Sequence, residues 1–225
     1  MPETFDCSAP ASLLAGVRAA RQALQTGGLA IMPTDTVYGI AADAFSPDAV
    51  AGLLAAKGRD RQSPPPVLVP DLQTLTALAE QVPAAVTALA EAFWPGPLTI
   101  IVRAQPSLSW DLGETKGTVA LRMPANDVAL GLLAETGPLA VSSANRHGEP
   151  ASTTAAGPAE ALAESVAVVL DAGEVGEGYE PHEADGRSQN GSTIVDATGE
   201  RIRIVRQGVL SRERIAEVVG EALAP

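Results

Sequence analysis

Hydroxyl side chains and a carboxylate follow one of the most apolar runs of this chain. Residues 29–32 read Leu-Ala-Ile-Met, Pro33 follows, and residues 34–36 read Thr-Asp-Thr. The short apolar run predicts a buried strand, and proline stops ladder pairing because it has no N–H. Polar groups at such a strand end are typical of a ligand site in an α/β protein. A capped turn without a ligand explains Thr-Asp-Thr equally well.

Basic side chains alternate in the next polar segment. Lys57, Arg59 and Arg61 precede three prolines at residues 64–66. In an extended segment this alternation directs Lys57 and Arg59 to one face. An ammonium group and a guanidinium group are the usual partners of phosphate oxygens. The segment therefore predicts an anion site, with a solvated surface strip as the alternative.

Further basic and hydroxyl groups follow other expected strands. Arg122 ends an apolar strand, where a guanidinium needs an anion or a wet cleft because a buried unpaired charge is very costly. Arg206 ends the last expected strand. Polar side chains accompany two further strand ends: Ser142, Ser143, Asn145 and Ser192. A helix cap or a local turn is the alternative for the first three. The set suits a polyanionic ligand beside a small polar one.

Several familiar chemistries find no support in the sequence. The chain contains no G-x-x-x-x-G-K-[ST], no G-x-G-x-x-G after a strand and no G-x-S-x-G. His147 lies near Ser143, but this order and spacing match no hydrolase triad. Cys7 is the only cysteine, so no intrachain disulfide can form. With one cysteine and two distant histidines, His147 and His182, a zinc site is not expected.

Alternating helical and strand-like segments must position these groups. Helices are expected at 11–25, 46–57, 71–81, 83–93, 126–135, 157–164 and 211–223. Strands are expected at 29–32, 67–69, 98–102, 118–123, 138–141, 166–170, 192–196 and 202–205. Residues 173–191 are rich in glycine and acids, have no apolar periodicity and predict a long mobile loop. The pattern predicts an α/β domain with a mixed sheet.

Composition limits the class of protein. The chain has 225 residues, of which 46% are hydrophobic and 19% charged, enough for one domain with a substantial core. Its net charge of -12 argues against general affinity for nucleic acid, which depends on neutralising phosphates. The N-terminus lacks a signal-peptide pattern, and no apolar run approaches the roughly 20 residues that cross a bilayer. We expect a cytoplasmic protein that does not contact membranes.

Seven motifs occur in an order that resembles a known family. They are PTDTVYGIAADA, KGR, FWPGPLTIIV, VALRMP, SSANRHGEPA, STIVDA and VRQGVL. This order is similar to that of the YrdC/TsaC-type threonylcarbamoyl-AMP synthases in their short, single-domain form. The resemblance covers about residues 12–215. It implies one YrdC-like domain, with a twisted mixed parallel and antiparallel sheet flanked by helices and a concave basic cleft.

The resemblance also implies a reaction. Such enzymes join L-threonine, bicarbonate and ATP into L-threonylcarbamoyl-AMP and release pyrophosphate. Mg²⁺ is expected to accompany ATP, held largely by the phosphates, with no metal site built by the protein. Partner proteins, the threonylcarbamoyl transferase complex, then use the product to modify tRNA. A contact of the enzyme with RNA is a further expectation.

Matching the motifs residue by residue assigns roles to the polar groups described above. Lys57 and Arg59 are expected to hold ATP phosphates and to act in catalysis. Ser143, Asn145 and Arg206 are expected to make the remaining contacts with ATP. The residues expected to contact threonine are Thr36, Arg122, Ser142 and Ser192. Nucleotidyl transfer depends on positioning and charge stabilisation, which agrees with the shortage of histidines.

Three features depart from the family pattern. Pro70 stands where many relatives have histidine, and Asp60 stands where they have proline after K-x-R. The segment 173–191 is longer and more acidic than expected, and we interpret it as a lid over the cleft.

Three alternatives to the synthase stay open at this stage. One is a double-stranded RNA- or tRNA-binding module of the same fold without synthase activity. Another is a related enzyme that uses carbamoyl phosphate, although such domains belong to larger proteins with zinc fingers. The third is a paralogue that has lost the activity.

Overall fold

The computed structural model describes residues 1–146, 148–184 and 187–225. His147, considered above as a neighbour of Ser143, lies outside these ranges, as do residues 185–186 of the expected loop. The helices are α1 Pro10–Gln25, α2 Pro47–Ala56, α3 Leu72–Leu78, α4 Ala84–Phe93, α5 Asp127–Thr136, α6 Ala156–Ala161, α7 Arg212–Val219 and the 3-10 helix Gly220–Ala222. No helix in the described ranges is long and apolar enough to cross a membrane.

Ten strands of the described chain form one twisted mixed sheet, in the order β1-β8-β2-β3-β7-β4-β6-β5-β11-β12. The strands are β1 Glu3–Asp6, β2 Ala30–Met32, β3 Gly39–Asp43, β4 Val67–Leu68, β5 Leu98–Arg103, β6 Thr118–Arg122, β7 Leu139–Ser143, β8 Val168–Asp171, β11 Thr193–Asp196 and β12 Arg203–Arg206. Pairs such as β1 with β8 and β5 with β11 are parallel, whereas β3 pairs antiparallel with β7 and β5 with β6. The predicted fold class is therefore confirmed.

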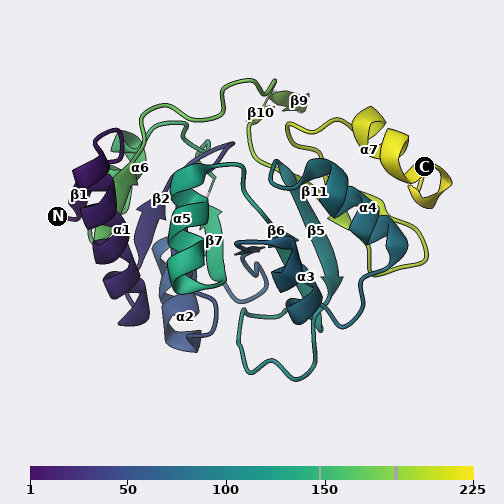
Figure 1. The fold of residues 1–225 in the computed structure, drawn as a ribbon, viewed down its shortest axis with the longest axis horizontal. Coiled ribbons are helices and arrows are strands. Elements are labelled where there is room, and N and C mark those ends of the chain that lie inside the picture. Colours follow the sequence, from purple (N-terminus) through teal and green to yellow (C-terminus); the bar gives the residue numbers. More distant parts are fainter. Residues whose placement is uncertain (147, 185–186) are drawn as a thin grey trace.

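The apolar run around β2 is continuous because both faces of that strand are covered. Ala30 and Met32 pack into a cluster with residues of α1 and α5. Leu29 and Ile31, which alternate with them, pack on the other face with residues of α2 and the region around α6. Figure 1 shows α1 and α5 side by side over this half of the sheet. This arrangement fixes the loop that carries Thr36 at the end of β2.

The other half of the sheet has its own core. Leu98 and Ile100 of β5, Leu121 of β6 and Val195 of β11 are buried against α3, α4 and α7. Helices α4 and α7 also contact each other; Figure 1 places them together near the C-terminus. The two cores hold the two ends of the sheet rigidly, so groups on β6, β7 and β12 keep fixed positions.

Three predictions about secondary structure are wrong. No strand was expected at residues 39–43, where the buried strand β3 pairs with β2 and β7. Strand β1 was not expected, because its four residues are mostly exposed and show no clear apolar alternation. Within residues 173–191, β9 His182–Ala184 pairs antiparallel with β10 Arg187–Gln189. This hairpin is a separate two-stranded sheet, so it needs no buried face and leaves no apolar periodicity in the sequence. The mobility of this segment stays a prediction.

Candidate active site

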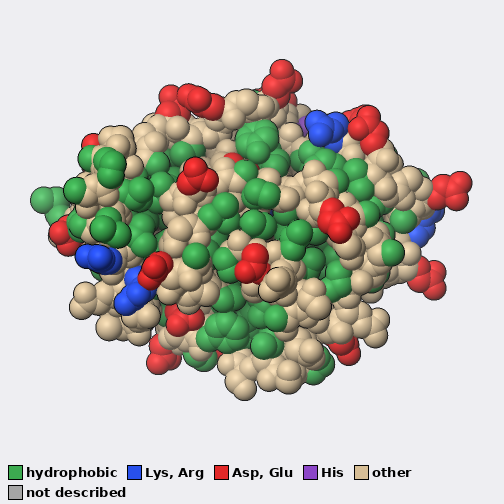
Figure 2. Space-filling model, in the orientation of Figure 1, with side chains coloured by type: hydrophobic (Ala, Val, Ile, Leu, Met, Phe, Trp, Pro, Cys, Tyr) green, Lys and Arg blue, Asp and Glu red, His purple; other side chains and the backbone are tan. Residues whose placement is uncertain are grey.

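Basic side chains are scarce in this chain, and four of them gather in one place. The face in Figure 2 carries scattered acidic side chains and few Lys or Arg. Burial lowers the pKa of the Arg206 guanidinium, and the nearby charges of Arg122 and Arg59 lower it further. Burial likewise lowers the pKa of Lys57 to about 8, with a further contribution from Arg59. Lys57 and Arg59 also hydrogen bond to the neighbouring residues Ser143 and Ser142 at the end of β7. We call Lys57, Arg59, Arg122 and Arg206 the cationic cluster.

Lys57 and Arg59 lie in the turn that ends helix α2, and this turn places both side chains in the cluster. Gly58 has a φ of +61°, which ends α2 in the left-handed conformation that favours glycine. The N–H of Gly58 donates to the carbonyl of Ala55 at 2.9 Å, and the N–H of Arg59 donates to that of Leu54 at 2.9 Å. The prediction of an extended segment is therefore wrong at residues 57–59. Both side chains nonetheless point toward the end of β7.

Lys57 binds the chain that follows β7. The side chain is buried, and its Nζ donates to the carbonyl of Ser143 at 2.5 Å, to Asn145 Oδ1 at 3.1 Å and to the carbonyl of Asn145. An ammonium group has three N–H donors, so these oxygens occupy all of them. Asn145 is fixed in turn, because its Nδ2 donates to the carbonyl of Glu149 at 2.7 Å. Direct contact between Lys57 and a phosphate stays a prediction, and it requires one of these bonds to open.

Arg59 is the cation with the most free donors. Its Nη1 donates to Ser142 Oγ at 3.2 Å, where Ser142 lies in β7. Within the described part of the chain this is the only hydrogen bond or ion pair of the Arg59 side chain. A guanidinium has five N–H donors in a planar fork that suits phosphate oxygens. Arg59 is therefore ready to bind an anion without breaking an existing ion pair.

Arg122 has the anionic partner that its position demands. The side chains of Arg122 and Asp35 are 7% and 5% exposed, and Nη2 lies 2.6 Å from Asp35 Oδ1. Nη1 donates to Thr36 Oγ1 at 3.1 Å, and Nε donates to the carbonyl of Gly96 at 3.0 Å. The sequence prediction that this arginine needs an anion is confirmed, and the anion is a carboxylate of the chain itself. Arg122 thereby fixes the hydroxyl of Thr36.

Ser192 and Arg206 meet where β11 begins and β12 ends. Arg206 Nη2 donates to the carbonyl of Ser192 at 2.7 Å, and Ser192 Oγ lies 2.7 Å from Thr99 Oγ1 of β5. The turn after Arg206 fits only because residue 208 is glycine. A Cβ on Gly208 would lie 2.2 Å from the carbonyl oxygen of Gly191. Thus the glycine allows the Arg206 turn to pack against the backbone before Ser192.

Thr36 lines a small cavity beside the cluster. The cavity has a volume of about 160 Å³, and residues 174–181 form much of its wall. The buried Thr36 hydroxyl lies 3.2 Å from the Thr34 hydroxyl. Of the residues predicted to bind a small polar ligand, Thr36 and Arg122 are thus joined directly, whereas Ser192 lies next to Arg206.

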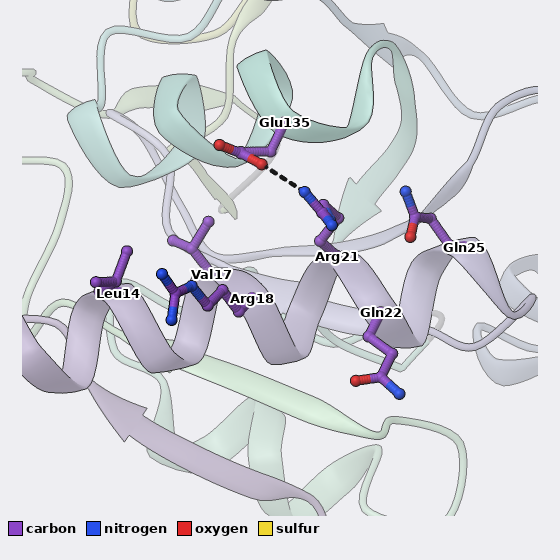
Figure 3. Close-up of a pocket in the computed structure, with 7 residues that line it drawn as sticks. All are labelled: Leu14, Val17, Arg18, Arg21, Gln22, Gln25 and Glu135. Atoms are coloured by element: carbon purple, nitrogen blue, oxygen red, sulfur yellow. Dashed lines mark hydrogen bonds and ion pairs between the residues drawn. The ribbon is translucent and has the colours of Figure 1, made fainter.

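Another hollow on the described surface lies away from this cavity. It measures about 500 Å³ and is lined by side chains of α1 together with Glu135 of α5. Figure 3 shows Arg21 reaching across it to Glu135, with Gln22 and Gln25 nearby. None of the predicted site residues lines this hollow. We therefore take the cationic cluster and the cavity over Thr36, rather than the hollow beside α1, as the candidate active site.

Sequence reasoning missed three of the supporting groups. Tyr179, Thr99 and the carbonyl of Gly96 contact the predicted residues, and none belongs to the polar strand ends. One signal was present for Tyr179, because it is one of only two tyrosines in the chain and stands in an acidic, glycine-rich segment. Thr99 lies within an expected strand and carried no distinguishing pattern.

The residues present do not form a magnesium site. No group of three His, Cys, Asp or Glu in the described ranges could hold a metal ion. Asp35, the carboxylate in contact with the cluster, has both oxygens engaged: Oδ1 by Arg122 and the N–H of Ala125, and Oδ2 by Tyr179. No step below therefore depends on a protein-bound metal.

The fold is an α/β fold with a mixed sheet, and its candidate site combines four basic side chains with a small cavity. The family model described as "Telomere recombination" (Sua5, YciO and YrdC) matches residues 22–208. The chain belongs to this family.

Individual relatives agree with this membership. A Mycobacterium tuberculosis (strain ATCC 25618 / H37Rv) protein named for threonylcarbamoyl-AMP synthase activity is 50% identical over 220 residues, 98% of this chain and 96% of its own length. The crystal structure of Pyrococcus abyssi Sua5 complexed with L-threonine matches with a TM-score of 0.83 and 31% identity, over 98% of this chain and 61% of that chain. Escherichia coli YciO shares the fold, with a TM-score of 0.80 at 20% identity over 96% of this chain and its full length.

Proposed function

We propose that this chain is a threonylcarbamoyl-AMP synthase, which makes L-threonylcarbamoyl-AMP from L-threonine, bicarbonate and ATP and releases pyrophosphate. The observation that carries the proposal is the meeting of Lys57, Arg59, Arg122 and Arg206 beside the Thr36 cavity. The cations suit a triphosphate, and the cavity suits a small hydroxylated amino acid. Membership of the family and the names of its relatives support the same activity.

The chemistry needs positioned charge more than a strong acid or base. The threonine amine forms a C–N bond with the carbon of bicarbonate, a C–O bond of bicarbonate breaks and water leaves, which gives a carbamate. A carbamate oxygen then attacks the α-phosphorus of ATP. The bond between the α-phosphorus and the bridging oxygen breaks, and pyrophosphate leaves with its negative charge. Negative charge therefore gathers on phosphate oxygens in the transition state. Fixed guanidinium and ammonium groups stabilise that charge without reorganisation, and holding the reactants in place lowers the entropic barrier.

Each predicted residue has a proposed role that fits its surroundings. Arg59 binds ATP phosphates with its free donors, and Lys57 supports it by holding the chain after β7. Arg206, at the end of β12 beside the start of β11, also binds the nucleotide. The residues that complete the ATP site are Ser143 and Asn145, and those that complete the threonine site are Thr36, Arg122, Ser142 and Ser192.

The remaining assignments follow from this reaction. Mg²⁺ enters as part of the ATP complex, held by the phosphates. The product passes to tRNA-modifying partner proteins, and the ATP requirement together with the lone Cys7 supports a cytoplasmic place of action. Residues 12–215 act as one domain, since the ten-stranded sheet draws strands from both ends of this range.

The test is pyrophosphate release from ATP by the purified chain. We expect release only when both L-threonine and bicarbonate are present, and threonylcarbamoyl-AMP as the nucleotide product. Release that ignores threonine would overturn the assignment. RNA binding has no comparable support, because the net charge of -12 argues against general affinity for phosphates.

A further inference from the structure

Residues 174–181, which we call the strap, form one wall of the cavity over Thr36 and contact neighbouring segments through hydrogen bonds. Just before the strap, the carbonyl of Gly173 accepts a hydrogen bond of 2.7 Å from the Tyr38 hydroxyl. Within it, the N–H of Val175 donates to the carbonyl of Thr153 at 2.9 Å. The strap is thus tied to the segment before α6 and to the β2–β3 connection.

A glycine lets the strap approach the site closely. Gly176 has a φ of +89°, and a Cβ at this position would lie 2.8 Å from the carbonyl oxygen of Thr36. Any other residue would push the strap away from Thr36. The close approach forms one wall of the cavity of about 160 Å³.

Tyr179 of the strap connects with the cationic cluster. Its hydroxyl donates to Asp35 Oδ2 at 3.3 Å. Burial raises the pKa of Tyr179 and the charge of Asp35 raises it further, so the hydroxyl stays a donor at neutral pH. Asp35 Oδ1 accepts from Arg122 at 2.6 Å, and Arg122 donates to Thr36. One line of contacts therefore runs from the strap through a buried ion pair to the cavity.

We propose that Tyr179 is a positioning residue, whose hydroxyl holds Asp35 and thereby sets Arg122 and Thr36 for the amino-acid substrate. Its hydrogen bond reaches Asp35 and, through it, the groups that border the cavity, whereas Arg59 faces Ser142. Loss of the hydroxyl should therefore weaken binding of the amino acid and leave binding of the nucleotide unchanged. The identity of this amino acid as L-threonine rests on the proposed function.

The first experiment is Tyr179→Phe, which removes the hydroxyl and keeps the ring in the cavity wall. We expect the KM for L-threonine to rise about fivefold, since a charged partner loses one hydrogen bond. The KM for ATP should stay at the wild-type value, and the melting temperature should fall by only a few degrees, because a single hydrogen bond to a buried carboxylate is lost. Glu180→Gln is the matched control, because Glu180 is the exposed neighbour and should leave all three quantities unchanged.

The second experiment repeats the substitution in an Asp35→Asn background. If Tyr179 acts through the Asp35 carboxylate, Tyr179→Phe should have little further effect there. An equal rise in the KM for threonine in both backgrounds would overturn the inference, as would a wild-type KM in the single variant. Those results presuppose threonine-dependent pyrophosphate release by the wild type. Threonine-independent release would instead overturn the proposed function and this inference with it.

Discussion

The buried ion pair between Arg122 and Asp35 allows a quantitative prediction. The two side chains are 7% and 5% exposed, with 2.6 Å between Nη2 and Oδ1. The change Asp35→Asn keeps the shape of the side chain and removes its charge. Arg122 would then be buried beside Thr36 without an anion. Breaking a buried pair by removing one partner costs about 3–5 kcal/mol.

The asparagine can still accept a hydrogen bond from Ala125, so we expect the lower end of that range, about 3 kcal/mol. For a chain of this size, each kcal/mol lowers the melting temperature by about 2–4 °C. Asp35→Asn should therefore melt about 6–12 °C below the wild type. The KM for threonine should rise as well, because Arg122 holds the Thr36 hydroxyl.

Urea denaturation and thermal melting measure this effect, and the chain supplies a matched control. Arg21 and Glu135 form an ion pair of 2.8 Å, but their side chains are 45% and 53% exposed. Exposed pairs contribute about 0–1 kcal/mol because water screens the charges. Glu135→Gln should thus change the free energy of unfolding by less than about 1 kcal/mol. The two ion pairs have similar distances, so the difference in their expected contribution to stability comes from burial.

Two results would refute this reasoning. One is an Asp35→Asn protein that is no less stable than Glu135→Gln. The other concerns Arg122→Met in the Asp35→Asn background, which removes the unpaired charge and should restore part of the lost stability. A further loss of stability in the double variant would show that the unpaired charge was not the cause.

Three further predictions concern the nucleotide side of the site. Arg59→Gln should raise the KM for ATP about tenfold with an unchanged melting temperature, because it removes a charged phosphate donor; a wild-type KM would exclude this residue. Lys57 has a pKa of about 8, so it is charged below that pH and neutral above it. ATP affinity, measured by calorimetry, should fall as the pH rises through 8, and Lys57→Arg should remove that fall. Gly208→Ala should destabilise the protein and slow turnover because its Cβ would lie 2.2 Å from a carbonyl oxygen, whereas Gly131→Ala, with nothing within 4 Å, should be neutral or stabilising.

Local signals in the sequence predicted most helices and strands. Ser46, Asn126 and Ser211 each accept a hydrogen bond from the backbone N–H three residues later, as their positions before helices indicated. The strand before Thr36 was visible as an apolar run because it is buried on both faces. Strand β1 was missed because a mostly exposed strand leaves no apolar period. The strands β9 and β10 were also missed, as was the buried strand β3, whose sequence of Gly, Ile and Ala carries no alternation.

The sequence by itself determined which groups could do chemistry. Lys57, Arg59, Arg122 and Arg206 stand after helices or strands, in motifs that already point to a polyanion. Each of them follows an apolar run or a helix within a few positions, so local patterns were enough to find them. The order of the seven motifs then identified the family.

Only the tertiary structure decided the partner of each group. Lys57 holds Asn145 across 88 positions, Arg122 pairs with Asp35 across 87, and Tyr179 reaches Asp35 across 144. Such pairs depend on strand order and register, which bring distant segments together. Local periodicity records whether a side chain is buried but not what it meets there, because that partner comes from another part of the chain.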